Sequence, residues 1–250
     1  MALTQQQLLM YEPIKHLVNR LMPFFKGLST NDFPDVQKLN LKFNQLNKNK
    51  KPLCFVEQNS SLPFAELGYE ERIFHSGIIA TRKDHWHDFF NALVWHAFPK
   101  TKTAINSLHA KELKEQKSTL RSRKRDLLTL FDESGVIVIA EESILELIKQ
   151  HKWNTLFVEK KQEWISGKIT LITFGHAMYE KYLAPYIGMT AQTLLLSSQV
   201  DDIDSFLATK LLDGHLLQNK SQLSPLPLLG VPGWHKDQDE AFYANKVYFR

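Results

Sequence analysis

The chain has 250 residues and a formal net charge of +4, and 43% of its residues are hydrophobic. A chain of this length buries most of its apolar surface on folding, so it needs neither disulfides nor a structural metal to hold a core. A single cysteine, Cys54, excludes an intrachain disulfide and agrees with a reducing compartment. With no internal repeat and no Gly/Ser linker, one domain over residues 1–250 is the simplest prediction.

Membrane and export signals are missing from the sequence pattern. The first residues, MALTQQQLLMYEPIKHL, lack the basic stretch and apolar core of a signal peptide. No apolar run approaches the ~20 residues that a membrane helix needs. We therefore expect a soluble, cytoplasmic protein without a membrane partner.

Helical spacing dominates the N-terminal part of the chain. Apolar residues predict a helix over 8–22, kinked or started at Pro13, so that residues 1–60 read as mainly helical. A second helix is predicted over 33–49, with Pro34 near its first turn. The segment 50–58 predicts a short strand, and 63–77 predicts a helix ended by Gly77.

The rest of the chain mixes helices with scattered strands. A polar helix is predicted over Thr101 to Lys117, and RDLLTLFDESGVIVIA (125–140) is interpreted as a β-hairpin with its tip at residues 132–135. Further helices are predicted over 141–151, 153–164, 176–184 and 201–212, with a strand at 168–174 and an apolar tail wrapping the domain. This pattern predicts an α+β fold, mostly helical, with a small β-hairpin or sheet.

The stretch from Arg82 to Lys102, RKDHWHDFFNALVWHAFPKTK, concentrates polar and aromatic residues. On a helix from Asp84 to Phe98, the histidines do not converge: His87 lies at one border of the apolar stripe, and His85 and His96 lie at the other. Asp84 is a candidate N-cap. Trp95 falls beside Asp88 and Asn91 on the polar side, which predicts that this side is also covered.

Other segments also carry groups capable of chemistry. His176 and Glu180, four residues apart, share a helix face and follow a strand and Gly175. Such a pair supplies metal ligands, or a histidine oriented by a carboxylate, or an incidental helix-surface contact. Lys102, Asn106 and His109 share another face. Asp132 and Glu133 are expected at the hairpin tip. The sequence has no phosphate-binding Gly-rich loop, Cys-x-x-Cys, His-Glu-x-x-His or Gly-x-Ser-x-Gly pattern.

Several segments from Tyr69 to the C-terminus resemble a known family. Six segments carry the resemblance: YEERIF; WHDFFNALVW with FPKTK, IN and H after it; RDLLTLFDESG; FGHAMYEKYLAPY with GMTA after it; PLPLLGVPGW; and FYANKVYFR. Together they resemble the proteobacterial family called domain of unknown function 3025, which implies a bacterial protein but no activity. His85 and His96 fall outside the family-like pattern. The positions that lie in it are Trp86, His87, Asp88, Asn91, Pro99, Lys102, Asn106, His109, Asp132, Glu133, Gly175, His176 and Glu180.

Three classes of function remain open on these residues. The first is an enzyme, with hydrolysis as its least demanding reaction, in which histidines and carboxylates run acid–base catalysis or hold a divalent metal. The second is nucleic-acid binding by the basic runs at 48–51 and 121–125. The third is a non-catalytic scaffold whose polar groups form internal networks. The catalytic candidates are His87, Asp88, Asn91, His109 and Asp132, and the candidate metal ligands are His87, Asp88, His176 and Glu180.

Overall fold

Two separate sheets organise the computed structural model, which describes residues 35–116, 120–197 and 200–250. In the smaller sheet, β1 (Cys54–Glu57) runs parallel to β2 (Ile78–Thr81). The larger sheet has the strand order β4-β3-β5-β6. Its centre is the parallel pair β3 (Gly135–Ile139) and β5 (Thr190–Leu196), flanked by antiparallel β4 (Thr170–Thr173) and β6 (Leu223–Pro227).

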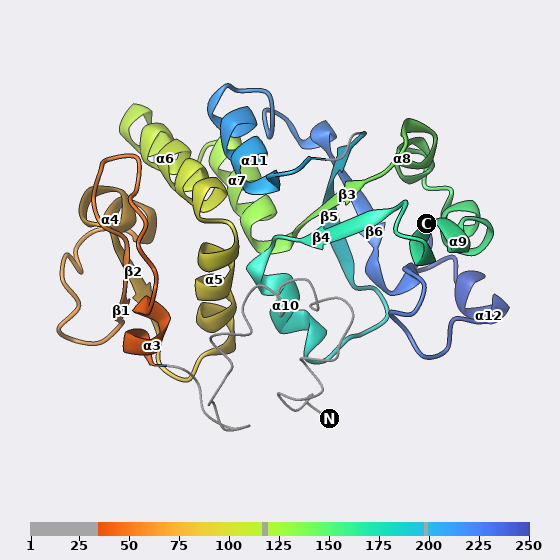
Figure 1. Cartoon of the computed structure of the whole chain (residues 1–250), viewed down its shortest axis with the longest axis horizontal. Coiled ribbons are helices and arrows are strands. Elements are labelled where there is room, and N and C mark those ends of the chain that lie inside the picture. Colours follow the sequence, from red (N-terminus) through yellow and green to blue (C-terminus); the bar gives the residue numbers. More distant parts are fainter. Residues whose placement is uncertain (1–34, 117–119, 198–199) are drawn as a thin grey trace.

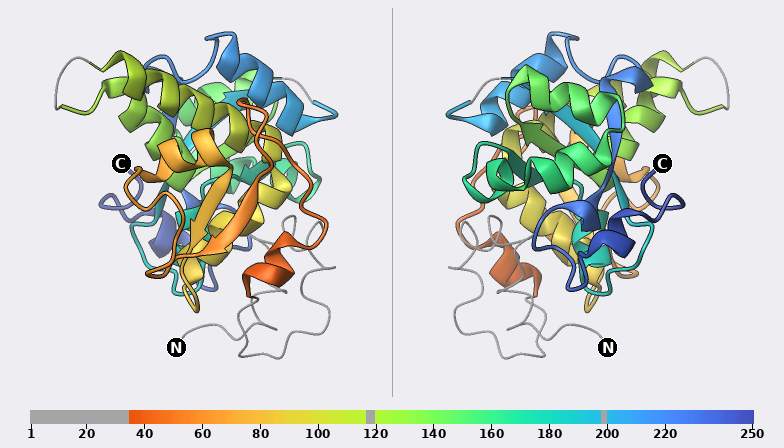
Figure 2. Two further views of the ribbon diagram at one scale, coloured as in Figure 1. Left: turned by 90° about the vertical axis from the view of Figure 1, so that its left-hand side faces the viewer. Right: turned by 90° about the vertical axis from the view of Figure 1, so that its right-hand side faces the viewer.

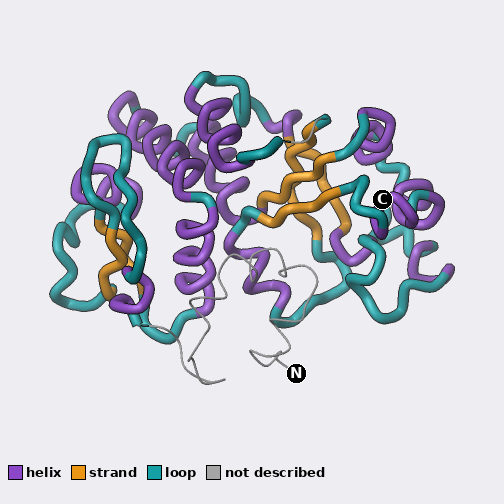
Figure 3. Tube along the Cα trace, in the orientation of Figure 1, coloured by secondary structure: helices purple, strands orange, loops and turns teal. Residues whose placement is uncertain are grey.

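Helices fill the space between the two sheets (Figures 1 and 3). The central group comprises α5 (Trp86–Ala97), α6 (Pro99–Glu115), α7 (Arg123–Ser134), α10 (His176–Tyr182) and α11 (Ile203–Leu212). Helix α5 packs against α10, and α6 packs against α4, α7 and α11. The outer helices are α3 (Val36–Asn40), α4 (Tyr69–Ser76), α8 (Glu142–Lys149), a π-helical turn (Thr155–Glu159), α9 (Lys161–Ile165) and α12 (Glu240–Tyr243). The α+β class predicted from the sequence is confirmed.

Helix α5 is buried on nearly all sides. Nine of its 12 residues are buried, and they include the polar residues Asp88 and Asn91. Trp95, which the helical pattern placed beside them, is only 1% exposed. The prediction that the polar side of this helix is covered is therefore correct. Asp84, however, lies before the helix with φ +53°, and the N-cap residue is His85.

The predicted hairpin over residues 125–140 is wrong. Helix α7 continues to Ser134, and β3 starts directly at Gly135. Ser122 caps the helix by accepting a hydrogen bond from the Arg125 backbone, and Leu127, Leu128 and Phe131 follow at helical spacing and are buried. Asp132 and Glu133 consequently lie in the last turn of α7 and not at a hairpin tip.

Other predicted boundaries also changed. The helix expected over 8–22 lies outside the described residues. The one expected over 33–49 ends at Asn40, whose side-chain amide exchanges two hydrogen bonds of 2.8 Å with the backbone of Phe55 in β1. Because the Asn40 side chain pairs with backbone groups of β1, the chain turns toward the strand and the helix does not continue. Helix α4 does end at Gly77, which adopts φ +81° as a left-handed cap.

The C-terminal segment wraps one end of the larger sheet, as predicted (Figure 2, right). Tyr248 is 6% exposed, accepts a hydrogen bond from the Leu229 backbone and donates one to the Met189 carbonyl. Trp153 donates to the Arg250 carbonyl at 2.6 Å. Across the described ranges, no helix combines the length and apolar character needed to cross a bilayer.

Candidate functional site

A polar pocket of about 250 Å³ opens where β2 and five helices meet. Helices α4, α5, α6, α7 and α10 each supply part of its wall. All five catalytic candidates predicted from the sequence line it, together with His176. The lining residues are Gln58, Tyr69, Glu70, Ala80, Arg82, His87, Asp88, Asn91, His109, Thr129, Asp132, Glu133 and His176.

Two histidines from different helices face each other in this pocket. The Nε2 atoms of His87, on α5, and His176, at the start of α10, lie 3.1 Å apart. Their rings are nearly perpendicular, with an interplanar angle of 76° and centroids 4.6 Å apart. The side chain of His87 is 28% exposed and that of His176 is 6% exposed, so the pair reaches from solvent into the core.

Each of these histidines has an acidic group behind it. Nδ1 of His87 lies 3.2 Å from Oε2 of Glu180, one turn along α10 from His176. Nδ1 of His176 is buried and lies 3.6 Å from Oδ2 of Asp132, and the backbone of Asp132 also hydrogen-bonds this ring. An ionised carboxylate and a backbone carbonyl can only accept, so both rings are favoured with hydrogen on Nδ1. The two Nε2 atoms then present lone pairs to each other.

Burial keeps His176 neutral. Desolvation lowers its pKa to about 3, with Lys102 and His87 acting in the same direction and Asp132 opposing them. Burial also acts to raise the pKa of Asp132, but the charge and the hydrogen bonds of Lys102 act against it, and this pKa lies below its usual range. The pocket therefore pairs a neutral imidazole with an ionised carboxylate.

Behind the histidines lies a buried ion pair. Nζ of Lys102, on α6, contacts both carboxylate oxygens of Asp132 at 2.6 and 2.7 Å and Oδ1 of Asn91 at 2.9 Å. Asn91 in turn donates to the hydroxyl of Tyr69 at 2.7 Å. The ammonium of Lys102 also lies 5.2 Å from the ring centroid of Trp95. This network joins α4, α5, α6 and α7, which explains the polar residues on α5.

Asp88 lines the same pocket but is bound to Arg82 and to neither histidine of the pair. Its carboxylate accepts two hydrogen bonds from the Arg82 side chain, at 2.7 and 3.0 Å, and one from the Arg82 backbone at 2.7 Å. Burial acts to raise the pKa of Asp88, but Arg82 lowers it below its ordinary value. Asp88 thus holds the loop before α5 to the helix, in a fork geometry typical of strong arginine–carboxylate pairs.

The four candidate metal ligands are brought near one another but not as a four-ligand shell. Glu180 contacts the Nδ1 side of His87, and Asp88 is occupied by Arg82. In the part of the chain that the structure describes, no three His, Cys, Asp or Glu side chains are arranged to hold a metal ion. The two Nε2 atoms are the ligand atoms that do converge.

His109 lines the deep side of the pocket. It is 2% exposed, and its Nδ1 has no hydrogen-bond partner. Burial lowers its pKa, whereas Glu70 and Asp132 act to raise it. One turn before it on α6, Asn106 donates to the side chain and to the backbone carbonyl of Glu70 at 2.7 and 2.8 Å. The helix predicted as polar over Thr101 to Lys117 is therefore buried along one side.

Gly175 brings the start of α10 against the end of α7. A Cβ at this position would lie 2.5 Å from the Glu133 carbonyl and 2.5 Å from the Gly135 amide nitrogen. The Gly175 amide donates to the Gly135 carbonyl at 2.7 Å. This close approach places His176 beside Asp132, so the glycine of FGH is a positioning residue for the site.

Gly175→Ala is expected to destabilise the protein by about 1–3 kcal/mol, as measured by urea denaturation, because two backbone segments must separate. The matched control is Gly167→Ala, where a Cβ meets nothing within 4 Å although φ is +77°. The control reports the cost of the left-handed backbone alone, about 1 kcal/mol. An equal or smaller loss for Gly175→Ala would contradict close packing at this position.

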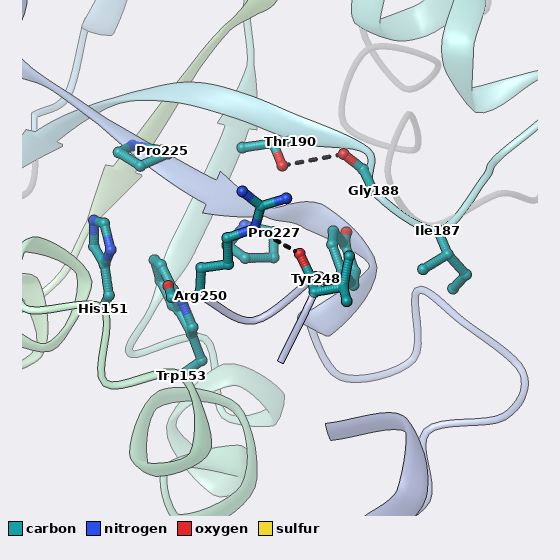
Figure 4. A pocket seen from close by; sticks show the side chains of 10 residues that line it. His151, Trp153, Ile187, Gly188, Thr190, Pro225, Pro227, Tyr248 and Arg250 are labelled. Carbon is teal, nitrogen blue, oxygen red and sulfur yellow. Dashed lines mark hydrogen bonds between the residues drawn. The ribbon is translucent and has the colours of Figure 1, made fainter. Parts of the chain in front are cut away.

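A second cavity, of about 440 Å³, lies at the far end of the larger sheet (Figure 4). Its walls come from β5, β6, the segment around Trp153 and the C-terminal residues up to Arg250. Figure 4 shows Pro225, Pro227 and Tyr248 along the strand side. None of the candidate catalytic residues lines this cavity, whereas all five of them line the polar pocket.

The basic run at 121–125 is engaged within the protein. Arg121 pairs with Asp126 at 3.0 Å, Lys124 donates to the Leu217 carbonyl at 2.6 Å, and Arg125 donates to Gln116 at 3.1 Å. Basic side chains held in this way lose freedom to follow a phosphate backbone. The geometry gives the nucleic-acid alternative no added support.

Several wall residues were not among the sequence candidates. Tyr69 and Glu70 come from YEERIF, and Arg82 starts the stretch that contains His87. Lys102 was noted for its helix face but not placed at the site, because sequence spacing alone does not show that α6 turns this face toward Asp132. The available signal was a lysine three residues before Ile105 on the same face of an otherwise amphipathic helix.

Fold and site together define an α+β protein with a histidine- and carboxylate-lined pocket between its central helices. The chain belongs to the family described as protein of unknown function (DUF3025), whose model matches residues 53–250. The match begins before Tyr69, so the small parallel sheet is part of the family region. No curated protein and no solved structure matches the chain.

Proposed function

We propose that the protein is an enzyme, a hydrolase, with His87 and His176 as its acid–base pair. The observation that carries this proposal is the 3.1 Å approach of two Nε2 atoms, each on a ring backed by a carboxylate, in an open pocket. A histidine oriented in this way by a carboxylate is the usual arrangement of a general base.

The proposed reaction uses a water molecule in the pocket as the nucleophile. A proton taken from this water is shared by the two Nε2 atoms, while both Nδ1–H groups stay directed at Glu180 and Asp132. The water oxygen forms the new bond to an acyl or phosphoryl centre, the bond to the leaving group breaks, and the same proton passes to that group. Glu180 and Asp132 stabilise the positive charge that the pair carries in between.

A cytoplasmic location belongs to the same proposal, since the single cysteine forms no intrachain disulfide. The Lys102–Asp132 network fits the scaffold alternative for the buried side of the site. A substitution of the partly exposed His87 distinguishes the hydrolase from the scaffold. If His87 has only a structural role, its substitution changes the stability of the protein but not the rate of hydrolysis.

His87→Gln is expected to reduce hydrolysis by at least ~100-fold, the scale of lost general-base catalysis. The assay uses a panel of nitrophenyl esters, phosphates, phosphodiesters and glycosides with purified full-length protein. His85→Gln is the control: it neighbours the pair, with its Nδ1 3.7 Å from Asp88, and is expected to retain activity. Turnover equal in all three proteins, or none by the wild type on any substrate, would count against the proposal.

A further inference from the structure

We propose that the Nε2 atoms of His87 and His176 together bind one divalent transition-metal ion, whose remaining coordination positions open into the polar pocket. This inference rests on the proposed hydrolase function and changes the role of the pair within it. With both Nε2 atoms bound to a metal ion, the histidines hold the nucleophilic water through that ion and do not take its proton. This metal site differs from the four-ligand set suggested by the sequence, since Asp88 and Glu180 are not ligands in it.

The distance between the two nitrogens suits a shared metal ion. Two nitrogen–metal bonds of about 2.05 Å that span the observed 3.1 Å enclose an angle of roughly 98°, between the octahedral and tetrahedral values. The observed spacing of the two nitrogens therefore allows both to bind one ion.

The tilt of the rings gives a second, independent indication. A linear N–H···N hydrogen bond of the observed length would place the ring centroids about 5.4 Å apart. Two rings aimed at one metal ion would place them about 4.8 Å apart. The observed separation is 4.6 Å, so the rings converge on a point beside the line between the nitrogens.

The tautomers favoured by the carboxylates lead to the same conclusion. With hydrogen on both Nδ1 atoms, two Nε2 lone pairs face each other at 3.1 Å and repel unless a cation lies between them. The buried Nδ1 of His176 beside Asp132, and Nδ1 of His87 beside Glu180, form the carboxylate–histidine arrangement found behind metal-ligating imidazoles.

The two imidazole ligands limit which metal ions suit the site. Imidazole nitrogens suit zinc, cobalt, nickel, copper and iron, whereas magnesium and calcium prefer oxygen ligands. Because the two histidines are the converging protein ligands, water completes the coordination. Water bound to zinc in an open site has a pKa near 7, which supplies a nucleophile at neutral pH.

The test is a titration of the chelator-treated, full-length protein with Co²⁺, read by its visible absorption bands, and with Zn²⁺, read by calorimetry. We expect one equivalent per chain. His87→Gln is expected to weaken binding by at least ~10-fold, and Glu180→Gln, behind the ligand, by ~10–100-fold. His85→Gln and Glu142→Gln, which change a histidine and an exposed acid outside the site, are expected to bind as the wild type does.

Circular dichroism of each variant shows that it is folded before it is titrated. Absence of saturable binding up to millimolar metal, or wild-type binding by His87→Gln, would overturn the metal site. Hydrolysis by chelator-treated protein with no metal binding would refute this inference and leave the acid–base proposal standing. Stoichiometric metal binding without turnover of any substrate would support the metal site and refute the proposed hydrolase function.

Discussion

Lys102→Met is expected to lower the free energy of unfolding by about 3–5 kcal/mol, because removing one partner of a buried ion pair leaves the other charge unpaired. The side chain of Lys102 is 4% exposed and that of Asp132 is 13% exposed, with Nζ 2.6 Å from Oδ1. Methionine keeps most of the side-chain volume, so the loss reports charge and hydrogen bonding. Urea denaturation of wild type and variant measures it.

Two further proteins make this prediction specific. Adding Asp132→Asn to Lys102→Met removes the unpaired charge and is expected to recover at least half of the lost stability. The matched control is Lys149→Met, which breaks an ion pair of 2.9 Å between Lys149 and Glu142 on the exposed face of α8. Exposed pairs contribute little, so its unfolding midpoint should hardly change. A double variant less stable than Lys102→Met would contradict the assignment of the loss to Asp132.

The chelator-treated protein is expected to lose about 2 kcal/mol of stability between pH 8 and pH 5 from His176 alone. The pKa of His176 is about 3 in the folded state, against an ordinary value of 6.5, because burial opposes its charge. The unfolded chain therefore binds more protons as the pH falls below about 6.5. Stability is fully present above that pH and is lost progressively toward pH 3.

Urea denaturation at several pH values measures how the free energy of unfolding depends on pH, and His176→Gln is expected to weaken this dependence. The weakening should be partial, because burial also lowers the pKa of His96 and of His109. Carboxylates with lowered pKa values, such as Asp132, add their own loss only at more acidic pH. A His176 ring whose NMR resonances titrate near pH 6.5 in the folded protein would contradict the burial argument.

Local sequence patterns predicted the helices better than the strands of this fold. Gly77 correctly predicted the end of α4, and the strand predicted at KITLITF (168–174) contains β4. Strands β5 and β6 were missed, because β6 contains two prolines and gains its order by pairing with β5. The hairpin error at 125–140 has a related cause, since β3 pairs with β4 and β5 from later in the chain, and nothing local shows this.

The sequence predicted His87, His176 and Asp132 as site residues, but it predicted neither the part of Lys102 nor the contacts among these side chains. The helical pattern separated His87 from His85 and His96, and the structure places His87 alone of the three against His176. The pattern could not show that Asp88 turns to Arg82, because the fork forms across a non-helical turn. Nor could it show that Asp132 lies between Lys102 and His176, since that depends on three helices meeting.

Asp132 joins the buried ion pair to the histidine pair through a single carboxylate, whose Oδ2 lies 2.7 Å from Lys102 and 3.6 Å from His176. A substitution there changes the stability of the fold and the electrostatics of the pocket at once. Related sequences should therefore vary at Lys102 and Asp132 together or at neither. An engineer who wishes to retune the pocket has more freedom at Glu180, whose side chain is 45% exposed and which contacts His87 without bracing the core.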